Sequence, residues 1–259
     1  MSRVVYIAAN TFREAIRDRV LYNLIAFALL LSGAAILVGQ ISIDIERLVV
    51  VNLGLTAVSL FGVVITIFIG IGLVSKEMEK RTLYTVLSRP VRRWEFIVGR
   101  FLGLAGTLFV NTFFMAIGVF AALLYVSHKF HSADAWILVA LFFIVLQFVI
   151  LCSLTLLFSS FSSPLLSAVF AFSLFVIGSF AEDLRLFARM TRGLGLTHGL
   201  AATAAYLVPN FSALNVIGQV AHEQPISAHL IAYNTGYALV YSTMAICGAV
   251  LIFERRNLK

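Results

Sequence analysis

Charged side chains are scarce in this chain. Asp, Glu, Lys and Arg make up 12% of its 259 residues and hydrophobic residues make up 61%, whereas a typical soluble domain is about 25% charged. So little charge cannot cover a soluble globular surface, and the composition therefore indicates an integral membrane protein. The net charge is +7, but the basic residues flank apolar runs and form no basic soluble domain, so nucleic-acid binding is not expected.

Several catalytic motifs are missing. The sequence has no Gly-x-x-x-x-Gly-Lys-Ser/Thr, Gly-x-Ser-x-Gly or His-Glu-x-x-His, so we expect no ATPase site, no serine nucleophile and no zinc site of that kind. The only cysteines, Cys152 and Cys247, lie in apolar runs and are interpreted as packing residues. His128, His131 and Asp134 are close in sequence, but such groups arise easily by chance on a short loop, so no metal or cofactor is expected.

Ionisable residues are almost absent from the apolar runs. A proton or ion path needs such residues inside the membrane, so their scarcity argues against an ion-coupled carrier or channel. The polar residues at or within the runs are uncharged amides, which commonly hold helices together: Asn52, Asn111, Gln147 and Asn234. A transporter without a coupling charge needs another energy source, and ATP hydrolysed by a separate subunit is the candidate.

Six apolar runs predict membrane spans, since a helix needs about 20 apolar residues to cross the hydrocarbon. They cover about residues 21–41, 48–74, 101–126, 136–158, 165–181 and 230–253. The expected fold is therefore all-α, a polytopic single transmembrane domain over 1–259. The first run is too long for the apolar part of a removable signal peptide.

The distribution of basic residues predicts the orientation. With the N-terminus in the cytoplasm, fourteen of the 19 Lys and Arg residues fall on the cytoplasmic side and five on the other side. Cytoplasmic loops carry the excess of Lys and Arg in membrane proteins. We therefore expect a multi-pass protein of the inner or plasma membrane with both termini in the cytoplasm.

The segment before the first run, residues 3–20, is amphipathic. Apolar residues repeat at three- and four-residue spacing, and most charged residues fall on the other face: Val5, Ala8, Ala9, Phe12, Ala15, Ile16 and Val20 against Arg13, Glu14, Arg17, Asp18 and Arg19. This pattern predicts a helix lying in the cytoplasmic interface. The alternative is a short flank that anchors the first span by charge.

The connection 182–229 is too long for an unstructured loop. Its charged part, 182–192, suits a short surface helix. Its apolar part, 195–220, is broken by Gly199 and by Pro209, which favours a hairpin of short helices, or a re-entrant hairpin, on the extracytoplasmic side. The alternative is a seventh span, which would move the basic C-terminus outside, against the orientation above.

Residues 75–100 form a charged island with seven of the 19 basic residues. We expect a helix over 75–87 that ends at Arg89-Pro90, because the residue before proline avoids the helical region. A second helix over 91–100 would lead into the third span. Such a compact, partly apolar loop suits a soluble partner, and the alternative is a charged topology loop with no partner.

The island also carries a family resemblance. The stretches Glu79-Lys80-Arg81-Thr82-Leu83, Leu87-Ser88-Arg89-Pro90-Val91-Arg92-Arg93-Trp94-Glu95 and Gly99-Arg100 resemble the ABC type-2 exporter permease family. A second stretch, from Tyr206 to Phe211 and from Leu214 to Val216, resembles the part of that family before its last span. One position departs from the pattern, since Arg81 stands where many members have glycine.

The resemblance implies a half-transporter with six spans. Two permease subunits, identical or different, would pair around a central path, and each would receive a separately encoded subunit that uses ATP. The segment 75–100 would be the coupling element that rests in a groove of that ATPase. The residues implied for this contact are Glu77, Glu79, Arg81, Thr82, Leu83, Arg89, Pro90, Arg92 and Arg93.

The function expected is therefore a permease subunit of an ATP-driven exporter that has no catalysis of its own and lies among membrane lipids. One alternative is a polytopic membrane enzyme or assembly factor, which would need His128, His131 and the histidines of 182–229 at one depth. The other is an ion-coupled carrier, which the lack of charges in the runs disfavours.

Overall fold

The computed structural model describes residues 3–17, 45–79, 92–127, 134–190 and 208–255, together with scattered positions between 22 and 38. Within these ranges, the side chains of 73–79 and of 255 are not described. Every regular element in this described part is a helix, so the predicted all-α class is confirmed. Scattered positions of the first expected span, 21–41, are described, and all of these are helical.

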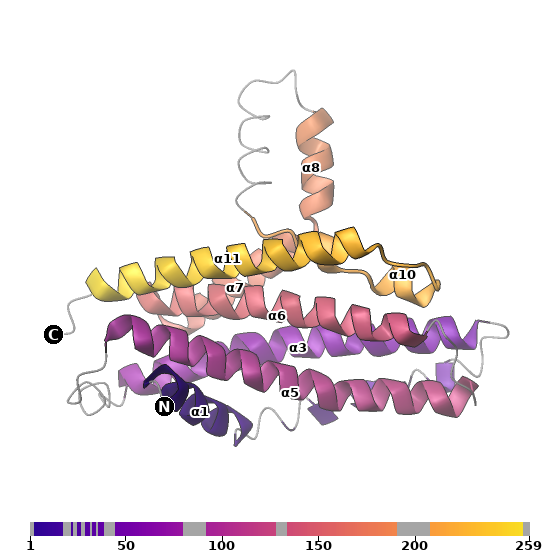
Figure 1. The fold of residues 1–259 in the computed structure, drawn as a ribbon, viewed down its shortest axis with the longest axis horizontal. Helices are drawn as coiled ribbons and strands as arrows, with labels where there is room; N and C mark the ends of the chain where they lie inside the picture. Colours follow the sequence, from indigo (N-terminus) through magenta and orange to yellow (C-terminus); the bar gives the residue numbers. More distant parts are fainter. Residues whose placement is uncertain are drawn as a thin grey trace.

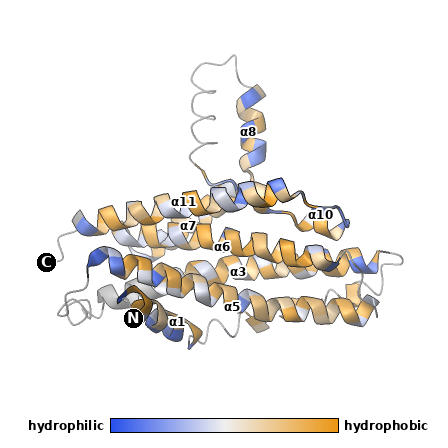
Figure 2. Cartoon of the chain, in the orientation of Figure 1, coloured by the Kyte–Doolittle hydropathy of each residue, from blue (hydrophilic) through white to orange (hydrophobic). Residues whose placement is uncertain are grey.

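Four long helices form a bundle: α3 (Glu46–Glu79), α5 (Arg93–Ser127), α6 (Ala135–Phe161) and α11 (Ala228–Arg255). They lie lengthwise beside one another (Figure 1), and each is long and apolar enough to cross a membrane. Their residues are hydrophobic along most of their length, and hydrophilic residues gather at the start of α5 and in α8 (Figure 2). The chain is therefore a multi-pass membrane protein, while the count of six spans stays a prediction.

Helix α6 is the centre of the bundle. It contacts α3, α5, α7 and α11, and residues such as Phe143, Ile144 and Ile150 are buried all around it. A helix that is hydrophobic on every side belongs in a core rather than at a surface. Its end is set by sequence, because the next helix, α7 (Pro164–Ser179), begins with a proline at its first position, where the missing N–H costs nothing.

The fifth apolar run forms a short, bent element. Helix α7 has 16 residues, about 24 Å at 1.5 Å per residue, which is less than the hydrocarbon thickness of about 30 Å. At Phe180 the chain turns by 60° into α8 (Ala181–Met190), which leaves the bundle (Figure 1). The Phe180 N–H donates to the Ile177 carbonyl, 3.1 Å away, and this tightened last turn accompanies the bend.

Helix α1 (Arg3–Ile16) packs along the first half of α5. Glycines on α5 permit this contact, since a Cβ at Gly103 would lie 2.5 Å from the Ala8 carbonyl oxygen and one at Gly99 would lie 2.8 Å from the Ile7 side chain. Thr11 and Ala15 are buried there. The helix falls within the amphipathic segment of the sequence, and its place at a membrane interface stays a prediction.

The bundle has two distinct ends. We call the end where α5 begins and α11 finishes the proximal end, and α1 also begins there (Figure 1). At the opposite, distal end, α3, α6 and α11 begin and a short segment with η2 (Ser212–Leu214) and α10 (Ile217–Ala221) is folded onto them.

Hydrogen bonds hold the distal segment in place. The Phe211 N–H donates to the Gly178 carbonyl at 3.0 Å, and the Asn210 N–H donates to the Tyr237 hydroxyl at 2.9 Å. The Asn234 amide nitrogen donates to the Ala213 carbonyl at 2.9 Å. Of the expected hairpin over 195–220, only residues from 208 onward are described; these two short elements lie against the bundle, and 191–207 lie outside the described residues.

Candidate functional site

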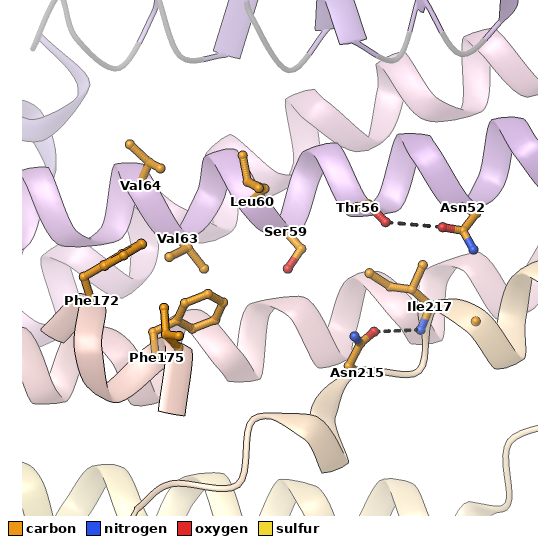
Figure 3. A pocket seen from close by; sticks show the side chains of 12 residues that line it. Asn52, Thr56, Ser59, Leu60, Val63, Val64, Phe172, Phe175, Asn215 and Ile217 are labelled. Carbon is orange, nitrogen blue, oxygen red and sulfur yellow. Dashed lines mark hydrogen bonds between the residues drawn. The ribbon is translucent and has the colours of Figure 1, made fainter. Parts of the chain in front are cut away.

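A cavity of about 450 Å³ opens between α3, α7 and the distal segment (Figure 3). Its volume falls in the range of small-molecule sites, about 300–1,000 Å³. Helix α3 contributes one wall, α7 contributes an aromatic wall, and the start of α10 contributes the third. The lining residues are Asn52, Thr56, Ser59, Leu60, Val63, Val64, Phe172, Phe175, Val176, Asn215, Ile217 and Gly218.

The polar wall comes from helical spacing. Asn52, Thr56 and Ser59 are four and three residues apart, which places them on one face of α3. The Thr56 hydroxyl donates to Asn52 Oδ1 at 3.4 Å, and the Ser59 hydroxyl oxygen accepts from Gln147 Nε2 at 3.4 Å. This face is only partly buried.

The remaining walls of the cavity come from α7, just before its bend, and from the distal segment. Phe172 and Phe175 lie on the part of α7 that precedes the bend, and Phe175 packs against Phe211, with ring centroids 5.4 Å apart. The Ile217 N–H donates to Asn215 Oδ1 at 3.3 Å, which fixes the Asn215 side chain beside the cavity. The residues that line the cavity include no Asp, Glu, Lys, Arg or His.

From the sequence, Asn52 is predicted only to hold helices together, and this cavity is not predicted. The spacing of Asn52, Thr56 and Ser59 was a readable signal for a polar face on the second apolar run. The other walls had no such signal, because Phe175 and Asn215 are brought together by the bend at Phe180 and the folding back of the distal segment.

The predicted coupling residues are only partly described. Helix α3 continues to Glu79, so Glu77 and Glu79 lie in its last turns, and their side chains are outside the description. Residues 80–91 lie outside the described residues. These include five of the implied contact residues: Arg81, Thr82, Leu83, Arg89 and Pro90.

The described end of the predicted coupling segment is anchored to the bundle. The Arg92 N–H donates to Glu95 Oε2 at 2.9 Å, a bond typical of a helix start. Arg93 Nη1 donates to two carbonyl oxygens in the last turn of α11, those of Phe253 at 3.0 Å and Glu254 at 2.8 Å. A cation at a helix C-terminus is favourable because the carbonyls there carry partial negative charge.

Behind Arg93, the start of α5 is packed against the end of α11. The guanidinium of Arg100 is buried and lies 4.7 Å from the centre of the Phe96 ring. Phe96 in turn stacks on Phe253, with centroids 6.0 Å apart. These contacts join the start of α5 to the last turns of α11.

Among the described residues, no group of three or more His, Cys, Asp or Glu side chains is arranged to hold a metal ion. His128 and His131 lie outside the described residues, and Asp134 pairs with Arg47 at the distal end.

Comparison with known protein families gives a match over nearly the whole chain. A family model described as "ABC-2 family transporter protein" matches residues 5–258. No curated protein matches the chain. The matched range includes both the cavity and residues 75–100, the predicted coupling segment.

Proposed function

This chain belongs to the ABC-2 transporter family, and we propose that it is the membrane-spanning permease subunit of an ATP-driven exporter. The observation that carries the proposal is the family match over nearly the whole chain, 5–258, together with a bundle of membrane-length apolar helices. In this proposal a separate subunit hydrolyses ATP, and residues 75–100 receive its movement at the proximal end.

The anchoring of Arg93 supports that coupling role. Force applied to a loop is useful only if the loop is tied to elements that can move together, and Arg93 joins the start of α5 to the last turn of α11. Nucleotide-driven closure of the ATPase would then shift the population between two arrangements of the bundle. We propose that both ends of the chain face the cytoplasm, since α1 begins and α11 finishes at the proximal end, where the described flanks of the coupling segment also lie.

The cavity supports a substrate path along α3 and α7. Amide and hydroxyl groups that face lipid would lose water without gaining partners. The partly exposed face of Asn52, Thr56 and Ser59 is therefore better suited to a path shared with a second permease subunit than to lipid. The Arg47 ion pairs, described below, would hold the distal edge of this path.

The test is a pull-down of the solubilised chain from native membranes, with bound proteins identified by mass spectrometry. We expect stoichiometric recovery of a soluble subunit with a P-loop. Glu79→Lys and Pro90→Gly should each lower that recovery and ATP-dependent transport while membrane insertion stays normal. Glu14→Lys, a matched charge reversal on the exposed face of α1, should leave both unchanged.

Two results would overturn the proposal. One is recovery of the chain alone from well-preserved membranes. The other is full ATPase binding and transport in both the Glu79 and the Pro90 variants, which would remove 75–100 as the coupling element.

A further inference from the structure

We propose that the cavity between α3, α7 and α10 binds an uncharged amphiphile, with its apolar body on the α7 aromatic wall and a hydrogen-bond-accepting group at Asn52 and Asn215. Its role as the transported substrate rests on the proposed function, whereas its binding does not.

A hydrogen bond from the Ile217 N–H fixes the orientation of the Asn215 amide. A backbone N–H can only donate, so the atom 3.3 Å from the Ile217 nitrogen is the amide oxygen. The Asn215 NH₂ group is then directed away from that bond and beside the cavity (Figure 3). Among the described residues it has no protein acceptor, so it is available to a ligand.

Asn52 repeats this arrangement from the opposite wall. Its oxygen accepts the Thr56 hydroxyl, and in the described part of the chain its NH₂ group has no protein acceptor either. Figure 3 shows the nitrogen of Asn52 on the side facing the distal segment. Two NH₂ donors on facing walls favour a ligand that accepts hydrogen bonds, such as an ester, amide or hydroxyl oxygen.

The remainder of the cavity is apolar. Phe172 and Phe175 form one side, and Leu60, Val63 and Val64 form the other. Phe172 is 53% exposed, so its ring is accessible to a ligand. Burial of apolar surface stabilises binding by about 25 cal/mol per Å², and this wall therefore favours a ligand with an alkyl or aromatic body.

Charge is excluded by the lining. With no ionisable side chain among the described residues of the walls, an ionised ligand would lose water and gain no counter-ion there, which is costly in an apolar environment. The head group is therefore a neutral acceptor, in contrast to a carboxylate, a phosphate or a quaternary amine.

The test measures binding to the permease alone, in lipid nanodiscs without detergent or ATPase. The probe is tritiated 1-decanoylglycerol, with counts from empty nanodiscs subtracted. We expect saturable binding, and competition by decanoate or decyltrimethylammonium should be weaker by roughly tenfold or more, because each places a charge in the cavity. Equal competition by all three amphiphiles, or tighter binding of an ion, would overturn the proposal.

Isosteric variants test the amides. Asn52→Asp and Asn215→Asp keep the oxygen that accepts from Thr56 or Ile217, remove the NH₂ donor and add a negative charge, so each should weaken probe binding by roughly tenfold or more. The matched control is Asn210→Asp. The Asn210 oxygen also accepts two local bonds, from Ser212 and Ala213, but Asn210 does not line the cavity, so binding should be unchanged.

A second variant fills the cavity. A Cβ placed on Gly218 would meet no atom within 4 Å, so Gly218→Leu projects into open space and should fold normally. We expect it to abolish saturable probe binding. If binding persists in this variant, or if the variant changes only the association of two permease copies, the cavity is not a ligand site.

The outcomes separate the two proposals. If the variants weaken probe binding as expected but no ATPase is recovered in the pull-down, the binding site stands and its role in transport is rejected. Recovery of the ATPase with no saturable probe binding would keep the permease function and reject this ligand class.

Discussion

The guanidinium of Arg47 lies 2.6 Å from the Asp134 carboxylate, measured from Nη2 to Oδ1. This pair joins the first turn of α3 to the residue before α6, where Asp134 is buried. The other terminal nitrogen of Arg47 donates to Glu223, in the turn that follows α10. One side chain therefore holds three segments together at the distal end, next to the helix that lines the cavity.

Arg47→Met should destabilise the protein by about 3 kcal/mol, because breaking a buried ion pair leaves a charge in a site of low polarity. Glu223 is more exposed, with 54% of its side chain accessible, so Glu223→Gln should cost less than about 1 kcal/mol. Unfolding in mixed micelles with increasing SDS measures both. Equal losses in the two variants would show that burial of Asp134 does not set the strength of this contact.

Gly62 and Phe148 are complementary in size. A Cβ at Gly62 would lie 1.9 Å from Phe148 Cζ, so Gly62→Ala should destabilise the contact of α3 with α6 by about 1–3 kcal/mol through overpacking. The matched control on the same helix is Gly72→Ala, where an added Cβ meets nothing within 4 Å. Thermal unfolding measures both, and Phe148→Leu should restore part of the loss in the Gly62 variant.

The contact between α1 and α5 depends on Gly103. Gly103→Ala places a methyl group against the Ala8 carbonyl and should separate the helices, whereas Gly106→Ala places it 3.6 Å from Phe12, an ordinary contact. Hydrogen exchange of residues 3–17 should rise in the Gly103 variant only. Unchanged exchange in that variant would mean that α1 is held to the bundle by other contacts.

Arg93 should control the order of the last turn of α11. Arg93→Ala removes the donor to the Phe253 and Glu254 carbonyls and should cost about 1–2 kcal/mol, with faster hydrogen exchange near the C-terminal end of α11. In Arg92→Ala the bond to Glu95 remains, because Arg92 donates it through its backbone. A similar rise in exchange for both variants would assign the effect to lost positive charge alone.

Much of the fold could be predicted because long apolar runs have few options in a membrane. The second, third, fourth and sixth runs each fall within one long helix, α3, α5, α6 and α11. The bend at Phe180 could not be predicted from the sequence, because a run from 165 to 181 without an internal proline is compatible with one straight helix. The bond from Phe211 to Gly178, made by residues distant in sequence, stabilises the bent form.

The site was predicted less completely than the fold. Arg92 and Arg93 were named from a motif, yet the bonds of Arg93 to α11 required the C-terminal helix to return to the proximal end. The ion pair of Asp134 could not be predicted from the sequence either, since its partner Arg47 is 87 residues away. The sequence had presented Asp134 only as a neighbour of two histidines.

The sequence by itself determined the class of protein, the membrane-length helices and the family, because hydrophobic run length, charge distribution and local motifs are all written in consecutive residues. Only the tertiary structure decided where α7 bends, which residues enclose the cavity and which carboxylates Arg47 pairs with. These features depend on contacts between segments far apart in the chain, and no local pattern specifies such a contact until the helices are packed.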